Sequence, residues 1–350
     1  MNKAANKVLI VGPSWVGDMV MAQSLCIDLK RRDPAVEIHI LAPAWTAALI
    51  DRMPEVSSLI SVDFVHGELG ISKRWKVARQ LAKQGFTQAI VLPNSIKAAL
   101  VPWFAGIATR TGWIGEQRYG LLNDIRSLDK QCWPMTVQRF IALGESPDAL
   151  PRAREQVPPP ALKTSSSVVS DLRLRLALND SAQILALCPG AEFGASKQWP
   201  AEHYAKVAQH YLNMGWQVWL LGSAKDQDTC AHINRVIDQR GQELAGKTSL
   251  PEAVDLLSCA DLVVSNDSGL MHIAAALSVP LVAVYGSTDP RHTPPLSHNH
   301  TIAWLNLECS PCFKRECPLE HLNCLIQLSA DNVIKDSQQV IAPNVSTHHD

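Results

Sequence analysis

The stretch 261–272 carries residue types that bind anions. It reads Asp-Leu-Val-Val-Ser-Asn-Asp-Ser-Gly-Leu-Met-His. An apolar run, a polar elbow and then small, apolar residues at helical spacing predict a buried strand, a tight turn and a helix. The first amides of a helix lack partners and carry its positive dipole end, so Ser268 and Gly269 are candidates to bind a diphosphate, with His272 one turn further on. The alternative is that Asp267 or Ser268 only caps the helix and that His272 lies on the surface.

Lys197 is a second candidate to bind an anion. It lies in a glycine-containing loop that follows the predicted strand 183–188, two residues before Trp199-Pro200 open a helix. A lysine there can neutralise a phosphate, although a loop lysine is by default solvated. The cation and the helix start at Ser268 together predict one diphosphate site.

Asp18 is the corresponding candidate in the first half of the chain. It ends the loop Gly12-Pro-Ser-Trp-Val-Gly-Asp after the first predicted strand. The glycine spacing is not that of a dinucleotide fingerprint, and Leu41-Ala-Pro43 ends the second strand where ribose binding needs an acid, which argues against nicotinamide chemistry. Asp18 is either an N-cap or a general base that faces a ligand. The Asp-x-Asp at 226–228 favours a helix start over a divalent cation site.

Basic residues in the first half predict contact with an anionic partner. The helix 72–84 carries lysines and an arginine along one face, which is either a solvated face or a surface for an anionic lipid or acceptor. Polar and basic residues near the ends of the later strands are better candidates to bind a charged acceptor. They are Asn94, Ser95, Lys97, Arg110 and Arg118.

Four of the nine cysteines cluster near the end of the chain. Cys309, Cys312, Cys317 and Cys324 have the spacing C-x2-C-x4-C-x6-C, with His321 between the last two. This spacing fits a structural zinc. Plain reduced thiols, an iron–sulfur cluster and a pair of disulfides remain alternatives, and disulfides are disfavoured in a reducing cytosol. A catalytic metal is not expected.

Strands and helices alternate along both halves, which predicts parallel sheets covered by helices. The predicted strands are 7–12, 36–42, 59–62, 88–92, 109–113, 183–188, 216–222, 242–245, 261–265 and 280–285. The predicted helices are 18–32, 44–52, 72–84, 95–104, 134–143, 168–178, 201–213, 226–239, 250–259 and 268–278. We therefore predict an α/β protein with two doubly wound, Rossmann-like domains that face each other across a cleft.

The predicted domains are 1–150, with the candidates for an anionic partner, and 168–330, with the candidates for a diphosphate. They are joined by a Pro/Ser-rich hinge at 151–167 and followed by a helix and polar tail at 331–350. Residues 1–160 hold 19 Lys+Arg against 14 Asp+Glu, net +5, and the rest hold 13 against 19, net −6. This asymmetry argues against a general nucleic-acid binder, which is usually basic throughout. No segment has the composition of a signal peptide or a membrane span, so we expect a cytoplasmic protein that touches a membrane only at its surface.

Several long motifs resemble the ADP-heptose:lipopolysaccharide heptosyltransferases, glycosyltransferase family 9 with the GT-B fold, and among them those that add the second heptose. The matching stretches span about residues 7–305 and are Gly12–Asp18, Leu92–Lys97, Thr111–Asp124, Pro189–Pro200 and Asn266–His272. The resemblance implies inverting, metal-independent transfer of heptose from ADP-heptose to heptosyl-Kdo2-lipid A at the cytoplasmic face of the inner membrane.

By the same resemblance, Asp18 matches the general base and Lys197 the diphosphate lysine. The other positions implied to bind the donor are Glu192, Ser196, Asp226, Thr248, Asp267, Ser268, Gly269 and His272. Two other functions remain open: a sugar-nucleotide epimerase, which would need acid/base residues on the sugar ring, and a binding regulator without turnover, which would tolerate loss of Asp18.

Overall fold

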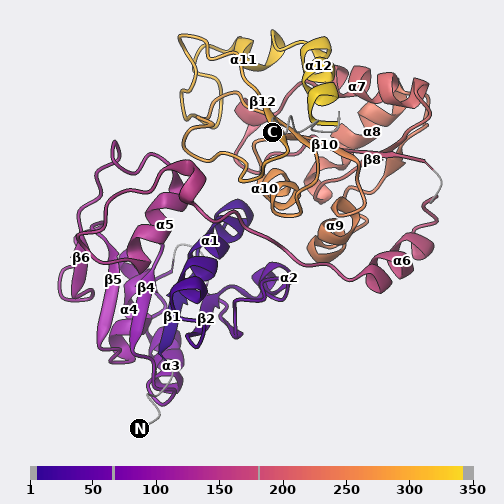
Figure 1. Cartoon of the computed structure of the whole chain (residues 1–350). Helices are drawn as coiled ribbons and strands as arrows, with labels where there is room; N and C mark the ends of the chain where they lie inside the picture. The colour runs from indigo at the N-terminus through magenta and orange to yellow at the C-terminus, as the bar shows by residue number, and fades with distance from the viewer. Residues whose placement is uncertain (1–5, 65–67, 180–181, 342–350) are drawn as a thin grey trace, which may run out of the picture. The chain divides into compact units, whose positions relative to one another are not determined.

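The computed structural model describes residues 6–64, 68–179 and 182–341. The chain forms two compact units, Met1–Ala161 and Leu162–Asp350 (Figure 1). The division lies inside the segment 151–167 that the sequence marks as a hinge. Within the described part, no helix is both long and apolar enough to cross a membrane.

The first unit contains a six-stranded parallel sheet in the order β3-β2-β1-β4-β5-β6. Its strands are β1 (Lys7–Val11), β2 (Glu37–Ala42), β3 (Ser58–Ser61), β4 (Gln88–Val91), β5 (Thr109–Trp113) and β6 (Asp124–Arg126). The central strands are apolar runs because helices cover both faces of the sheet. Ile10 of β1 pairs with Ile40 of β2 and with Ile90 of β4, and all three are buried.

In the described part of this unit, five α-helices and two short 3-10 turns surround the sheet (Figure 1). They are α1 (Val16–Arg32), η1 (Ala44–Thr46), α2 (Ala47–Ile50), α3 (Ile71–Leu81), α4 (Ile96–Phe104), α5 (Thr136–Gly144) and η2 (Arg154–Gln156). Helix α1 packs against α5, and α3 packs against α4. Ala78 and Ala99 of α3 and α4 join Leu9 and Val91 of the sheet in one buried apolar cluster.

The second unit repeats this topology with a sheet in the order β12-β11-β10-β7-β8-β9, also parallel. Its strands are β7 (Ile184–Cys188), β8 (Gln217–Leu220), β9 (Gln242–Glu243), β10 (Leu262–Asn266), β11 (Leu281–Val284) and β12 (His300–Ala303). Its helices are α6 (Ser166–Arg175), η3 (Ala195–Lys197), α7 (Ala201–Asn213), η4 (Ala224–Asp226), α8 (Gln227–Val236), α9 (Leu250–Leu257), α10 (Gly269–Ala276), α11 (Asn323–Ile326) and α12 (Ala330–Ile341).

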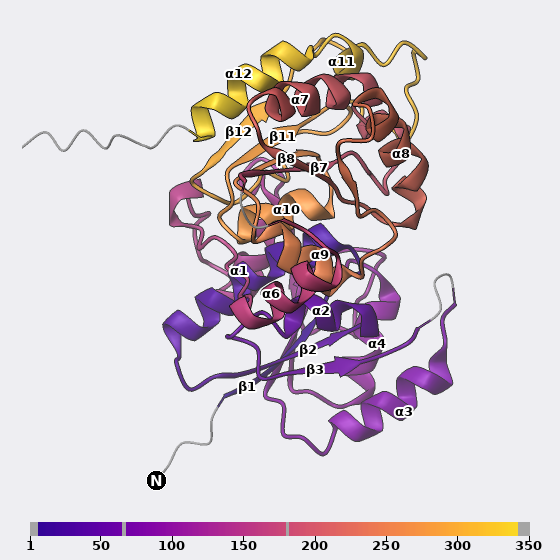
Figure 2. The ribbon, with the colours of Figure 1, turned by 90° about the vertical axis from the view of Figure 1, so that its right-hand side faces the viewer.

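The prediction of two α/β units with parallel, helix-covered sheets is confirmed. The sequence analysis missed β6, β12 and α11, each of which has only three or four residues. The predicted strand 242–245 is reduced to Gln242–Glu243. The expected C-terminal helix is α12, which packs on β11, β12 and α7 of its own unit (Figure 2).

Candidate active site

The second unit gathers polar residues where its strand order reverses. Strand β7 lies between β8 and β10, so the chain leaves β7 and β10 toward opposite faces of the sheet. Loops at such a switch point form the usual ligand crevice of doubly wound sheets. Residues 189–199 follow β7, and the elbow 267–268 follows β10.

Lys197 and Asp267 meet at this switch point. The Lys197 Nζ atom lies 2.6 Å from Asp267 Oδ2, and both side chains are largely buried. The same carboxylate oxygen accepts a hydrogen bond from Thr288 Oγ1 at 2.5 Å. Lys197 Nζ also lies 5.0 Å from the centre of the Phe193 ring. Because an ammonium has three donors, Lys197 can hold Asp267 and still donate to an incoming phosphate.

Asn266 fixes the Lys197 loop to the end of β10. Its Oδ1 accepts hydrogen bonds from Trp199 N at 3.1 Å and from the Tyr204 hydroxyl at 3.0 Å, while its Nδ2 donates to Pro189 O at 2.6 Å. Asn266 and Tyr204 are fully buried. Both ends of the 189–199 loop are therefore tied to one side chain, which holds Lys197 in place.

Helix α10 begins directly after this ion pair. Ser268 is its N-cap residue, but its side chain makes no capping hydrogen bond, and Gly269 is the first helical residue. The first amides of the helix are consequently free of intrahelical partners and suit an anion. His272 is buried and not on the surface. Burial lowers its pKa from 6.5 to about 4, with Asp267 opposing and Lys197 reinforcing the shift, so its imidazole is neutral near pH 7.

Three other residues predicted to bind the donor have local partners of their own. Glu192 pairs with Lys225 on an exposed surface. Asp226 accepts hydrogen bonds from the Ser223 amide and hydroxyl, both at 2.8 Å, and caps the turn before α8, which explains the Asp-x-Asp sequence without a metal. Thr248 donates to Leu244 O at 3.2 Å.

Ser196 differs from the other predicted donor residues because its side chain is buried against the cysteine-rich loop. Its hydroxyl lies 2.9 Å from Ser287 Oγ and also donates to Lys314 O. Its amide donates to Arg315 O at 3.2 Å. Ser196 therefore holds the Lys197 loop, and its hydroxyl is already bonded away from the anion site.

The cysteine-rich loop 309–324 therefore packs against the Lys197 loop and supports it. All four of its cysteines are free thiols. Burial raises the pKa of Cys324 to about 11, with the charges of Cys309, Cys312 and Cys317 contributing. Across the described residues, no group of three His, Cys, Asp or Glu side chains is arranged to hold a metal ion. The zinc site stays a prediction from the cysteine spacing.

The first unit has its own switch point, between β1 and β4. Asp18 is the third residue of α1, in its first turn, and Trp15 occupies the N-cap position. The N-cap alternative for Asp18 is thus wrong. Beside it in the sheet, the loop after β4 carries Asn94, then Ser95 as the N-cap of α4, then Lys97 in the first turn of α4. The Ser95 hydroxyl accepts a hydrogen bond from Ala98 N at 3.3 Å.

Arg118 does not have the exposure that the sequence analysis expected of an acceptor contact. It is 2% exposed. Its guanidinium donates to Pro93 O at 2.7 Å, Trp113 O at 2.7 Å and Ser95 O at 3.2 Å. Burial lowers its pKa, while Glu116 opposes the shift. Arg118 is a structural clamp that holds the 93–95 loop against β5. Arg110 likewise donates to Leu121 O and Ile107 O.

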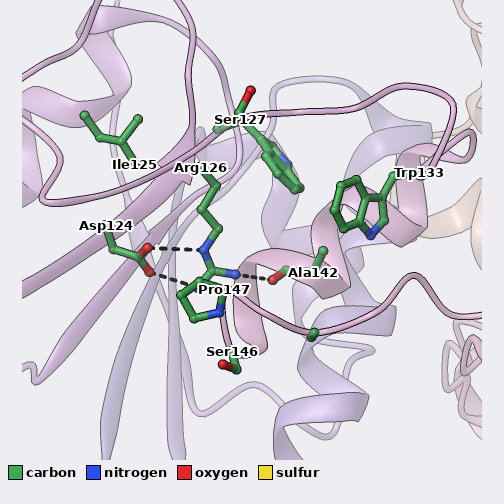
Figure 3. A pocket seen from close by; sticks show the side chains of 10 residues that line it. Asp124, Ile125, Arg126, Ser127, Trp133, Ala142, Ser146 and Pro147 are labelled. Carbon is green, nitrogen blue, oxygen red and sulfur yellow. Dashed lines mark hydrogen bonds and ion pairs between the residues drawn. The ribbon is translucent and has the colours of Figure 1, made fainter.

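A pocket of about 250 Å³ lies at the carboxyl ends of β5 and β6 (Figure 3). Trp113 and Trp133 line it, with ring centroids 5.5 Å apart. Arg126 crosses it and pairs with Asp124 at 2.8 Å, and its guanidinium also donates to Glu145 O at 2.9 Å. The charge of Arg126 is therefore neutralised, and the pocket is characterised mainly by its two tryptophan rings.

The sequence analysis missed three residues that contact the Lys197 loop or Asp267: Phe193, Asn266 and Thr288. Thr288 follows β11 in a Gly-Ser-Thr sequence, and a polar residue at the carboxyl end of a neighbouring strand was a usable signal. Phe193 and Asn266 stood inside motifs already singled out, but their contacts depend on chain segments far apart in sequence.

This chain is similar in sequence to known proteins. The model of glycosyltransferase family 9 (heptosyltransferase) matches residues 74–323. The chain belongs to glycosyltransferase family 9. It is 43% identical over 337 residues to lipopolysaccharide heptosyltransferase 2 of Escherichia coli strain K12, covering 94% of this chain and 97% of that one. It is 45% identical over 307 residues to lipooligosaccharide heptosyltransferase 2 of Haemophilus influenzae, covering 84% and 87%.

A solved structure extends this relationship to the whole fold. The structure of E. coli ADP-heptose lps heptosyltransferase II matches with a TM-score of 0.84 and 41% identity, covering 96% of this chain and 98% of that one. The expected glycosyltransferase fold with two Rossmann-like units is thus confirmed for this family 9 member.

Proposed function

We propose that this glycosyltransferase moves L-glycero-D-manno-heptose from ADP-heptose to heptosyl-Kdo2-lipid A and so adds the second heptose of the lipopolysaccharide core. The buried Lys197–Asp267 pair at the start of α10 is the observation that carries the proposal, because it places a fixed cation beside free helix amides. The similarity to lipopolysaccharide heptosyltransferase 2 over 94% of the chain supports this choice of donor and acceptor.

In the proposed mechanism, the second unit binds ADP-heptose through its diphosphate. Negative charge grows on the diphosphate as the bond to the heptose breaks. Lys197 and the amides of Ser268 and Gly269 stabilise this charge, and preorganised donors are most effective in a site with little water. His272 stays neutral, so it adds no charge that varies near pH 7. These groups supply the stabilisation that a metal provides in other transferases, so we propose metal-independent transfer.

The first unit provides the base. Asp18 accepts the proton of the acceptor hydroxyl as that oxygen attacks the anomeric carbon from the face opposite the leaving ADP, which inverts the configuration. A positioned general base contributes about 10²–10⁴ in rate. The loop Asn94–Lys97 binds polar groups of the acceptor, and the pocket beside Trp133 offers a ring face for one of its sugars. We further propose that the protein works at the cytoplasmic face of the inner membrane.

An acceptor-dependent assay tests the proposal. Purified protein is incubated with ADP-heptose, with or without a core acceptor that carries one heptose, and ADP release is measured. We expect release only with the acceptor, and we expect it to persist in EDTA. Release without acceptor, or epimerised sugar in the products, would replace transfer with hydrolysis or epimerase activity. Donor binding without any turnover would favour the regulator.

A structural zinc at Cys309, Cys312, Cys317 and Cys324 stays a prediction from the cysteine spacing. Elemental analysis of purified protein tests it, with Cys309→Ser/Cys312→Ser as the matched variant. About one zinc per chain in the parent and none in the variant would support the site. Stable protein without zinc would end the prediction.

A further inference from the structure

Helices α3 and α4 of the first unit pack against each other (Figure 2). Both expose large aromatic side chains. Trp75 of α3 is 47% exposed and Trp103 of α4 is 43% exposed. Phe104 links them, since its ring centroid lies 5.2 Å from that of Trp75 and 5.0 Å from that of Trp103. Ile71, at the start of α3, is 53% exposed. Contiguous exposed apolar side chains of this size mark interaction sites more often than ordinary surface.

The same helices carry a dense positive charge. Residues 69–115 contain seven Lys and Arg and no Asp or Glu. Four of these cations are exposed on α3 or just beyond its end: Lys73, Lys76, Arg79 and Lys83. Among the residues that the structure describes, none of the four makes an ion pair. We call these four cations, with Ile71, Trp75, Trp103 and Phe104, the α3–α4 face.

A hydrogen bond within the fold connects this face to the predicted acceptor loop. Arg74 of α3 is 6% exposed, and its Nη1 donates to Lys97 O at 2.9 Å. Lys97 belongs to the first turn of α4, which Ser95 caps. Helix α3, which carries most of the α3–α4 face, is therefore tied to the first turn of α4, directly after the loop at the carboxyl end of β4.

We propose that the α3–α4 face docks on a bilayer surface that contains anionic phospholipids. Tryptophan is enriched at the boundary between headgroups and acyl chains, and Lys and Arg bind the negative charge of the lipid headgroups. A peripheral helix face binds through its buried apolar area together with this electrostatic attraction. The absence of any acid from residues 69–115 fits a uniformly negative surface better than a protein surface of mixed charge. The inference deepens the proposed function, because it names the surface that meets the membrane holding the lipid acceptor.

Vesicle sedimentation tests the docking surface. The full chain is mixed with vesicles of phosphatidylcholine alone or with about a third phosphatidylglycerol. We expect binding to the anionic vesicles that weakens as salt rises. Trp75→Ser/Trp103→Ser removes the apolar anchor, and Lys76→Glu/Lys83→Glu reverses part of the charge. Each pair should weaken binding roughly tenfold or more, since one basic residue near an anionic surface contributes about a fivefold effect. Parent-like binding by both pairs would overturn the proposal.

Matched variants control for general effects on the surface. Trp45→Ser removes a tryptophan that is 40% exposed outside the face, and Lys206→Glu/Lys335→Glu reverses two exposed lysines of the second unit. Both should bind vesicles like the parent. Sedimentation velocity without lipid tests the remaining outcome, which is self-association through this face. If the parent does not bind vesicles but self-associates, and Trp75→Ser/Trp103→Ser abolishes the self-association, the face is a contact between two copies and the proposal is overturned.

Activity separates this inference from the proposed function. With a deacylated, water-soluble acceptor, variants of the face should keep the parent rate, and with acceptor in anionic vesicles they should lose about tenfold. Loss of rate on the soluble acceptor would assign the face to the acceptor site and overturn membrane docking. A parent that docks on vesicles through this face but transfers no heptose would leave the docking surface standing and remove the proposed function.

Discussion

In both units a largely buried basic side chain holds the loop at the switch point in place, but its partners differ. In the second unit, the loop after β7 is held by charge, because Lys197 pairs with Asp267, which also accepts a hydrogen bond from Thr288. In the first unit, the loop after β4 is held by Arg118, whose Nη1 and Nη2 atoms donate only to neutral oxygens. A fixed ion pair suits the side where a leaving group gains charge. Arg118 fixes its loop through hydrogen bonds to neutral backbone carbonyls, so no carboxylate is needed beside the loop.

Asp18→Asn should have the largest effect of these variants. The effect should be on the transfer step and not on donor binding. The amide has nearly the same shape but accepts no proton, so kcat should fall by about 10²–10⁴. The affinity for ADP, measured by calorimetry, should stay within about twofold of the parent. A variant that keeps its rate would remove Asp18 from the mechanism.

Lys197→Met breaks the ion pair that holds the loop in the second unit. It leaves Asp267 buried without its cation, so the free energy of unfolding should fall by about 3–5 kcal/mol. Affinity for ADP should fall about 10- to 100-fold, because a charge-assisted hydrogen bond is lost. The measurements are urea unfolding and calorimetry.

The double variant Lys197→Met/Asp267→Asn separates these two effects. It removes both charges, so most of the stability should return while ADP affinity stays low. Recovery of both would show that Lys197 acts only through folding.

Arg118→Met breaks the hydrogen bonds that hold the loop in the first unit. Three backbone carbonyls lose their donor, and we expect unfolding of this unit to become easier by about 2–4 kcal/mol. Arg118→Lys should rescue only part of this, because one ammonium does not reproduce the planar fork of a guanidinium. Affinity for ADP should not change. An acceptor KM that rises without any loss of stability would return Arg118 to acceptor binding.

His272 should give the smallest effect, and it should depend on pH. Its pKa is about 4 in the folded protein against 6.5 ordinarily. As the pH falls below about 6.5, the unfolded chain binds this proton first, so folding loses stability until the folded-state pKa is reached. Between pH 7 and about 4.5 the loss from this group is about 2.5 kcal/mol. His272→Gln should lose that much less over the same range in urea unfolding, and an equal loss in both proteins would contradict the pKa shift.

The sequence was enough to predict the elements with strong apolar runs and the residues beside them. Strands β1, β4, β7 and β10 are buried on both faces, and their apolar runs predict their place in a parallel sheet. The polar residues at their carboxyl ends follow from that placement. Strand β6 reads Asp-Ile-Arg and β12 reads His-Thr-Ile-Ala, and neither has an apolar run to reveal it.

The burial of individual polar side chains could not be predicted in the same way. Arg118 and Ser196 both stand in loops rich in polar residues and glycine, where exposure is the ordinary expectation. Arg118 is buried because carbonyls on either side of it in the fold, at Pro93 and Trp113, need a donor. Ser196 is buried because residues about 120 positions later fold over it. Such contacts depend on tertiary structure, which local sequence patterns do not report.

The backing of the Lys197 loop by residues 313–315 has a practical consequence for anyone who handles this enzyme. Ser196 and Ser287 are hydrogen-bonded to a segment that lies between Cys312 and Cys317. We expect that alkylating or oxidising those thiols would strain this support of the Lys197 loop. Batches purified without reductant should then differ in ADP affinity while their acceptor chemistry is intact, so thiol titration belongs beside every donor-binding measurement.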